Sequence, residues 1–259
     1  MAIYLGEQEL TLQGFQSMYC GADLIWTRPE IWTWTSSGMI PGDYKEHTTL
    51  SAKVITADQP TTMANLFNGQ KNLRRLDLSN FDASKATSSK STFQGCSNLK
   101  NIEFGHFNTS AVTSFWSMFT GCTSLKSLDL SSFDTSQGKS FIAMFARCES
   151  LETLDLSNFD THNATSFGGM FGYCKNLQHL DVSSFDTSRV TNFTGMFQNC
   201  ESLETLDLSS FDFGASSGVG AMLMGCTKLS TVYCRTQEDA DKLKNEKTTP
   251  DTIQFIVKK

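Results

Sequence analysis

Hydrophobic and polar positions along this chain repeat with a period of 26 residues. Six cysteines, at positions 96, 122, 148, 174, 200 and 226, mark the same point of each repeat. A fixed period of this length is typical of a solenoid, in which each coil covers the apolar face of its neighbour. We therefore expect one elongated domain of stacked coils rather than two globular domains.

The first half of each repeat predicts a short strand. One copy places leucine at 125, 128 and 130 and phenylalanine at 133, which is the pattern L-x-x-L-x-L-x-x-F. Within it, Leu128-Asp129-Leu130 alternates apolar and polar residues, as expected of a strand whose leucines point inward. Equivalent pairs at 76/78, 102/104, 154/156, 180/182 and 206/208 predict a parallel sheet of stacked strands.

The second half changes its period. Val112, Phe115, Met118, Phe119 and Cys122 are spaced i, i+3, i+6, i+7 and i+10, which predicts one face of a short helix. Each coil is then a strand, a turn, a short helix and a Gly-Cys corner. The expected fold class is α/β: a leucine-rich-repeat solenoid with a parallel β-sheet and short helices, capped at both ends.

The period also sets the expected domain organisation. Residues 1–46 predict an amino-terminal β-hairpin segment for attachment or capping, and residues 47–235 predict the solenoid. Within the solenoid, 47–70 is a degenerate first coil and 71–226 holds six regular coils. Residues 236–259 predict a carboxy-terminal cap, with a helix that starts near Thr236 and a closing strand from Thr252 to Val257.

Composition narrows the function classes. The net charge is −6 and the pI is near 5.2, which disfavours nucleic acid as a partner. No apolar run is long enough to predict a membrane span, and the first residues do not predict a secretory signal. The cysteine column predicts buried free thiols, although stacked coils would allow disulfides. No recurring C-x-x-C or histidine partner predicts a metal, and no motif predicts a cofactor. Cys20 and Cys234 lie outside the column.

The central outward position of each predicted strand is acidic. These residues would form an acidic ladder on the concave face: Asp77, Glu103, Asp129, Asp155, Asp181 and Asp207. Three interpretations stay open: a solvated ladder relieved by neighbouring serine hydroxyls, a docking strip for a cationic partner, or a calcium site. A second column, here called the second acidic column, holds five aspartates and one asparagine: Asp82, Asn108, Asp134, Asp160, Asp186 and Asp212. It falls in a turn, where backbone capping explains it.

Catalysis finds little support in the sequence. A column of equivalent aspartates does not separate an acid from a nucleophile. The four histidines, at 47, 106, 162 and 179, are scattered, and no serine lies in a G-x-S-x-G motif. We expect a non-enzymatic protein.

Two stretches resemble known families. Leu203-Glu-Thr-Leu-Asp-Leu-Ser-Ser-Phe-Asp and Val190-Thr-Asn-Phe-Thr-Gly-Met-Phe-Gln-Asn-Cys resemble the 26-residue leucine-rich repeats of BspA-like bacterial surface proteins. That resemblance covers about residues 47–235 and implies adhesion or protein interaction. The amino-terminal stretches Ile3-Tyr-Leu-Gly-Glu-Gln-Glu-Leu and Met18-Tyr-Cys-Gly-Ala-Asp-Leu-Ile-Trp are similar to short modules of phage tail and fibre proteins.

Three tryptophans follow that segment or close it, at Trp26, Trp32 and Trp34. They predict either a buried cap on the first coil or an interface with a partner. Our leading expectation is a phage virion component (tail, fibre or capsid decoration) that presents the solenoid to other virion proteins or a host surface receptor. The alternative is a bacterial cell-surface adhesin. Location follows the role, virion or bacterial surface, and homo-oligomer formation stays open.

Overall fold

The computed structural model describes residues 59–105, 107–214, 216 and 218–258 in full. It also describes the backbone of the strands between residues 3 and 56 and the side chains of 31–33 and 52–54. Two antiparallel hairpins come first in the chain, and they form separate two-stranded sheets. Their strands are β1 (Ile3–Leu5), β2 (Gln8–Leu10), β3 (Ser17–Cys20) and β4 (Asp23–Thr27).

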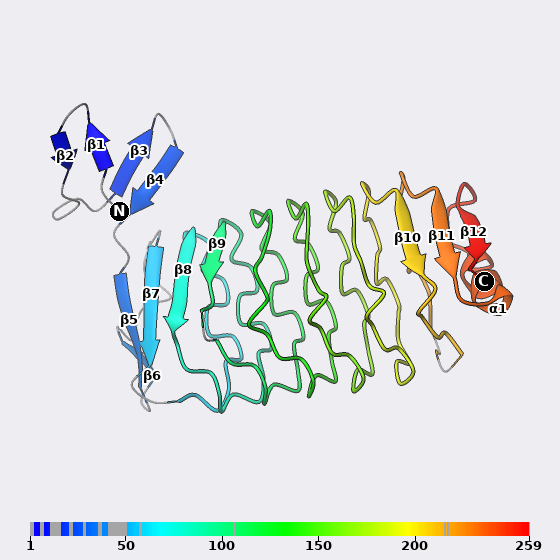
Figure 1. Cartoon of the computed structure of the whole chain (residues 1–259), viewed down its shortest axis with the longest axis horizontal. Helices are drawn as coiled ribbons and strands as arrows, with labels where there is room; N and C mark the ends of the chain where they lie inside the picture. Colours follow the sequence, from blue (N-terminus) through cyan, green and yellow to red (C-terminus); the bar gives the residue numbers. More distant parts are fainter. Residues whose placement is uncertain are drawn as a thin grey trace.

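The rest of the chain winds into the predicted solenoid, whose coils stack side by side along one axis (Figure 1). At its amino-terminal end, five strands pair in the order β6-β5-β7-β8-β9, parallel except for β6. At its carboxy-terminal end, β10, β11 and β12 pair in parallel. The bounds are β5 (Glu30–Thr35), β6 (Gly38–Ile40), β7 (Ser51–Thr56), β8 (Arg75–Asn80), β9 (Asn101–Glu103), β10 (Thr205–Leu208), β11 (Thr231–Cys234), α1 (Gln237–Lys244) and β12 (Gln254–Val257).

The central coils keep the predicted alternation but not regular strands. Leu128 and Leu130 are buried around the exposed Asp129, yet this segment is not paired as a strand with its neighbours. The amide of Ser131 donates to the Asp129 carboxylate at 3.0 Å. The same bond forms at Asp77 in β8 and at Asp207 in β10, so it occurs in regular strands as well as in the irregular segments between β9 and β10.

The second half of each coil forms stacked turns, so the helix predicted there is wrong. Alternate amides bond to the next coil at 2.8–3.0 Å, for example from Ser89, Ser91, Phe93 and Gly95 to the carbonyls of Ser114, Trp116, Met118 and Thr120. Ser91 and Gly95 have φ of 55° and 74°, in the left-handed region that an α-helix excludes. Bonds between coils take up the amides that a helix would use internally. In the described part of the chain, α1 is the one α-helix.

The core is a stack of identical side chains. Six phenylalanine rings lie nearly parallel with centroids 5.2–5.7 Å apart, at positions 67, 93, 119, 145, 171 and 197. Trp32, fully buried in β5, stacks on Phe67 at 6.3 Å and ends the column. At the other end α1 buries Ala240 and Leu243, and Thr236 caps it by accepting the Asp239 amide at 3.1 Å. The predicted terminal helix and closing strand are confirmed.

The sequence predicts that the solenoid begins at residue 47, but its sheet begins earlier in the chain, at β5. β5 pairs in parallel with β7, with Trp32 opposite Val54, so β5 and β6 continue the sheet of the solenoid. The attachment role of residues 1–46 stays a prediction.

Candidate functional site

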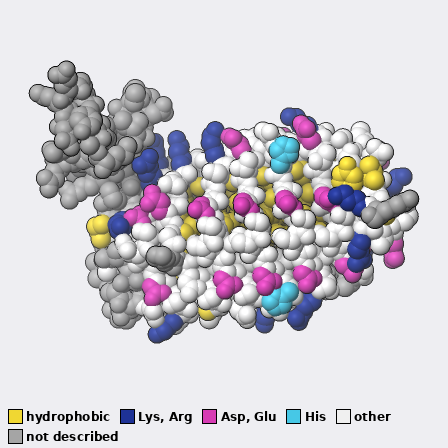
Figure 2. Space-filling view, viewed as in Figure 1, with side chains coloured by type: hydrophobic (Ala, Val, Ile, Leu, Met, Phe, Trp, Pro, Cys, Tyr) yellow, Lys and Arg dark blue, Asp and Glu magenta, His cyan; other side chains and the backbone are white. Residues whose placement is uncertain are grey.

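The acidic ladder lies where the sequence places it, along the outer face of the strands, here called the strand face. In β8, Leu76 and Leu78 are buried on either side of the partly exposed Asp77. One to four coils further on, its equivalents are exposed: Glu103, Asp129, Asp155 and Asp181. Figure 2 shows acidic side chains in a row along this face.

Each ladder aspartate is held by the backbone two residues further on. The amides of Ser131, Ser157 and Ser183 donate to the preceding aspartates at 2.9–3.0 Å. The amides of Ser79 and Ser209 do the same for Asp77 and Asp207. The bond holds one carboxylate oxygen of each aspartate and so restricts the side-chain rotamer.

The same serines keep the ladder charged. The hydroxyl and amide of Ser131 lower the pKa of Asp129, and the amide and hydroxyl of Ser157 lower that of Asp155. At Asp181 the bonds from Ser183 lower the pKa more than neighbouring aspartates and burial raise it. Donors to the charged form favour ionisation, so these three aspartates have pKa values below the usual aspartate value.

Lysines neutralise the two ends of the ladder. Lys53 of β7 lies 3.0 Å from Asp77, and Lys258 forms an ion pair with Asp207 from 51 residues away. At Asp77 and Asp207 burial raises the pKa, but the serine and lysine donors outweigh it. In the described part of the chain, no lysine or arginine pairs with the four carboxylates between these ends: Glu103, Asp129, Asp155 and Asp181.

Shallow depressions lie between successive rungs of this unneutralised stretch. The first has a volume of 320 Å³ and is lined by Glu103, Asp129 and Ser131, among others. The next two, of 140 and 100 Å³, lie between Asp129 and Asp155 and between Asp155 and Asp181. Each offers two carboxylates and serine hydroxyls, which is a set of acceptors for a cationic donor.

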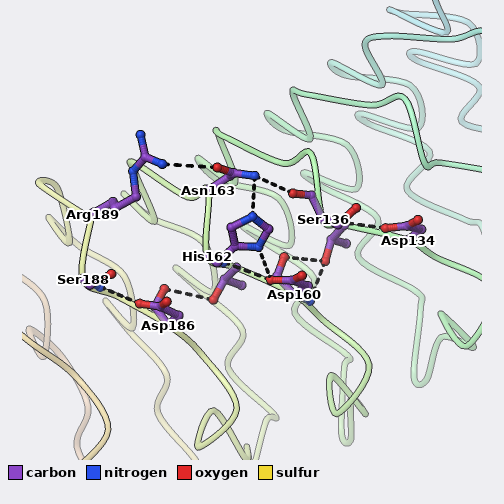
Figure 3. Close-up of polar contacts among 10 residues, drawn as sticks. Asp134, Ser136, Asp160, His162, Asn163, Asp186, Ser188 and Arg189 are labelled. Atoms are coloured by element: carbon purple, nitrogen blue, oxygen red, sulfur yellow. Dashed lines mark hydrogen bonds and ion pairs between the residues drawn. The ribbon is translucent and has the colours of Figure 1, made fainter.

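The second acidic column lies at the corner that follows the strands, and Figure 3 shows three of its coils. Asp134, Asp160 and Asp186 each accept the amide two residues further on, at 2.9–3.1 Å. This is the backbone capping that the sequence predicts for a turn. These carboxylates are occupied as parts of the corner itself.

The one histidine in that corner bridges two neighbours. His162 Nδ1 lies 2.7 Å from Asp160 Oδ1, and Asn163 Nδ2 lies 2.8 Å from His162 Nε2. Asn163 also reaches the Ser136 carbonyl, and Arg189 donates to its amide oxygen at 3.3 Å (Figure 3). Since the amide donates to Nε2, the imidazole proton lies on Nδ1, facing Asp160. Neither nitrogen is left to deprotonate a nucleophile, so this is a structural bridge.

The tryptophan hypothesis divides. Trp32 is fully buried, so the interface hypothesis does not hold for that side chain; capping the phenylalanine stack requires its burial. Trp26 lies in β4 and Trp34 in β5, opposite Met18 and Met39 in the pairing, and their side chains are outside the described residues. Trp116, which no sequence pattern marks as an interface residue, is 43% exposed on the turns, and the Lys90 ammonium lies 4.1 Å from its ring centroid.

The cysteine column is buried and unbridged, as predicted. The six column cysteines are free thiols, and each Sγ donates to a phenylalanine carbonyl of the preceding coil, as Cys122 does to Phe93 at 3.1 Å. Burial raises the pKa of Cys96 and Cys226 to about 12 and that of the four between them well above the ordinary value. Among the described residues, no three potential ligands gather around a metal position, and no helix is long and apolar enough to cross a membrane.

Stacked parallel coils with inward leucines define a leucine-rich-repeat-type solenoid. The chain belongs to the family described as "Mycoplasma protein of unknown function, DUF285", whose model matches residues 61–179 and 139–238. No curated protein matches the chain.

Two solved structures are similar to it. The Treponema pallidum leucine-rich repeat protein shares 18% identity with a TM-score of 0.44, over 80% of this chain and 87% of that one. A leucine-rich cell surface protein of Faecalibacterium prausnitzii shares 15% identity with a TM-score of 0.23, over 99% and 94%. Neither is described as a virion or BspA-like protein, so the virion role and the BspA resemblance are without support from these matches.

Proposed function

We propose that this protein is a non-enzymatic binding module of a bacterial surface protein, whose strand face holds cationic side chains of a protein partner. One observation carries the proposal: the unneutralised stretch of the ladder, Glu103 to Asp181, between two ends closed by Lys53 and Lys258. Among the described residues, lysines pair with the ladder only at its first and last rungs. The stretch between those rungs therefore carries carboxylates that no described lysine or arginine matches.

The arrangement suits a cationic partner physically. A lysine ammonium brings three donors and an arginine guanidinium five, and each depression between rungs presents acceptors from two carboxylates and the neighbouring serines. The amides of Ser131, Ser157 and Ser183 already hold the carboxylates in place, so binding immobilises few further rotamers on this side. Opposite charge would also relieve repulsion between stacked carboxylates.

The ladder does not favour calcium. Calcium takes six to eight oxygen ligands, whereas each depression offers a pair of carboxylates on one open face. Within the described residues no group of three acidic or other metal-ligating side chains converges.

The test measures binding of a fluorescent peptide of alternating lysine and serine by anisotropy, with a glutamine-for-lysine peptide as the ligand control. The double variant Asp129→Asn, Asp155→Asn should weaken binding about 10-fold or more, because two charges leave adjacent depressions. The fold should persist, since an asparagine fills the same capping role at Asn108, accepting the Ser110 amide at 2.8 Å.

A matched control separates the ladder from overall charge. Asp134→Asn, Asp186→Asn removes the same charge from the second acidic column and should change the affinity less than about 2-fold. Equal losses in both double variants, or no peptide binding at about 1 mM, would leave the ladder as a solvated surface and refute the proposal.

The surface location has its own test. Brief protease treatment of intact cells should release solenoid peptides while a cytosolic marker stays intact. Peptides recovered only after lysis would refute the location without touching the binding proposal.

A further inference from the structure

Charge is segregated along the edge where each coil leads into its strand, here called the strand-start edge. It consists of residues 71–75 and their equivalents in each later coil, up to 201–205. In the first three coils it carries five cations and no carboxylate: Lys71, Arg74, Arg75, Lys100 and Lys126. In the next three it carries four glutamates and one lysine: Glu149, Glu152, Lys175, Glu201 and Glu204. Figure 2 shows dark-blue side chains along the upper margin, over the amino-terminal coils.

Backbone bonds between coils keep these side chains in columns. The Lys100 amide donates to the Arg74 carbonyl at 2.9 Å, and the Glu152 amide donates to the Lys126 carbonyl at 2.9 Å. The column of Arg74 therefore continues through positions 100, 126, 152, 178 and 204. The column of Lys71 continues through 97, 123, 149, 175 and 201.

Ion pairs within the chain form in the middle of the edge. Lys126 lies 2.9 Å from Glu152 and Lys175 lies 2.9 Å from Glu149; the first pair is exposed and the second is partly exposed. Toward the two ends, the described part of the chain provides no ion-pair partner for Lys71, Arg74, Lys100, Glu201 or Glu204. Like charges thus remain stacked at one end, and the opposite sign remains at the other.

The pattern is self-complementary about one point. Consider a second copy generated by a twofold axis that passes between the Lys126 coil and the Glu152 coil and runs from the turns to the strand face. The coils of the second copy then follow in the opposite order, and each column faces the same column of the partner. This arrangement sets Arg74 opposite the partner's Glu204 and Lys71 opposite the partner's Glu201. At the centre the two Lys126–Glu152 pairs meet. Lys100 faces the partner's Gln178, so none of these positions faces its own sign.

We propose that two copies of this chain associate through their strand-start edges in an antiparallel, twofold-symmetric dimer. Symmetric dimers use one patch on both subunits, and a patch with a basic half and an acidic half satisfies that requirement by itself. Electrostatic complementarity then sets the register, since a shift by one coil misaligns the pairs. The axis leaves both strand faces on the same side, so a multivalent cationic partner meets two ladders at once.

Charge reversal gives a test that needs no ligand, so its failure is distinct from a failure of the binding proposal. Sedimentation velocity at about 0.1 mM protein and low ionic strength, near 0.01–0.1 M, should show the unaltered protein as a dimer that dissociates near 1 M salt. Arg74→Glu and Glu204→Arg should each weaken dimerisation at least 10-fold. In a dimer of either variant, positions 74 and 204 carry the same charge and face each other at both ends of the interface.

Mixing the two variants is the decisive step. In the mixed dimer, the carboxylate introduced by Arg74→Glu in one copy would face the guanidinium introduced by Glu204→Arg in the other. At the second contact the native Glu204 of the first copy would face the native Arg74 of the second, so dimerisation should return. Lys71→Glu with Glu201→Lys repeats the design one column away, in case Arg74→Glu impairs folding. Lys139→Glu, an exposed reversal off this edge, should leave the dimer intact.

Three results would overturn the proposal: a monomeric unaltered protein at low salt, a mixture that stays monomeric, or equal weakening by Lys139→Glu. If the protein is monomeric, binds inorganic polyphosphate, and no longer binds it after Arg74→Glu, then the basic half of the edge is a binding site for an anionic polymer instead.

Discussion

Raising the pH from about 8 to about 10.5 is expected to unfold the solenoid through its column of six buried thiols. Burial raises the pKa of Cys96 and Cys226 to about 12, and that of the four cysteines between them lies well above the ordinary 9.0. In the unfolded chain all six titrate near the ordinary value. The folded state therefore holds protons that the unfolded state gives up.

The sign and size follow from that difference. Because the folded-state pKa is raised, the stabilisation is complete below about pH 9 and is lost as the pH climbs toward about 12. In this pH window each thiol lowers the free energy of unfolding by about 1.4 kcal/mol per pH unit. Six thiols give a slope of about 8 kcal/mol per unit, against a typical total stability of about 5–15 kcal/mol.

The assay is denaturant unfolding followed by circular dichroism at steps of pH. Cys148→Ser keeps a hydroxyl near the Phe119 carbonyl, 3.2 Å from the native Sγ, and removes one titrating group. Its slope should be shallower by about 1.4 kcal/mol per pH unit, whatever its stability at neutral pH. All other ionisable groups are the same in both proteins and cancel in the comparison. An unchanged slope, or thiols that alkylate in the native protein at pH 9 as fast as in denaturant, would refute the reasoning.

Three smaller predictions concern stability and are read by denaturant unfolding at neutral pH. Ser132→Asn should stabilise by about 1 kcal/mol: Ser132 Oγ is buried with no partner in the described structure, whereas Asn158, one coil on, donates to two carbonyls at 2.9–3.0 Å. No gain would mean that asparagine does not reach the equivalent carbonyls. Ala143→Gly should stabilise the protein and Gly169→Ala should destabilise it, each by about 0.5 kcal/mol, because both positions have φ above +50°, where a side chain is strained. Nothing lies within 4 Å of a Cβ added at 169, so the backbone conformation alone sets the effect there. Shifts of the same sign in the two variants would contradict this reason. Thr236→Ala should cost about 1 kcal/mol by removing the cap of α1, and an unchanged midpoint would show that packing alone holds the helix.

The two proposals use different surfaces of one repeat. The strand face carries like charges, of which the described chain matches only the first and last, whereas the strand-start edge carries both signs and matches itself. A dimer formed through the edge would leave Asp129, Asp155 and their neighbours open. Self-association and partner binding are therefore compatible.

The sequence by itself determined the solenoid and its core. The period of 26 residues shows that coils stack, and the spacing of apolar residues within one coil shows which side chains point inward. Both can be read from residues that are close together in the chain. The same local signals located α1, with its cap at Thr236, and the strand β12. They also placed the acidic ladder, because every second residue of an extended segment shares a face.

Only the tertiary structure decided how the coils bond and which charges are matched. The spacing of Phe115, Met118 and Phe119 suits a helix, yet bonds between coils consume the amides and produce turns. Lys258 reaches Asp207 across 51 residues, and Trp32 ends the phenylalanine stack from outside the repeat. These contacts join residues far apart in the chain, and their geometry depends on how far each coil is shifted against the next. A periodic sequence shows that the coils stack, but their contacts arise only once that stacking is fixed in space.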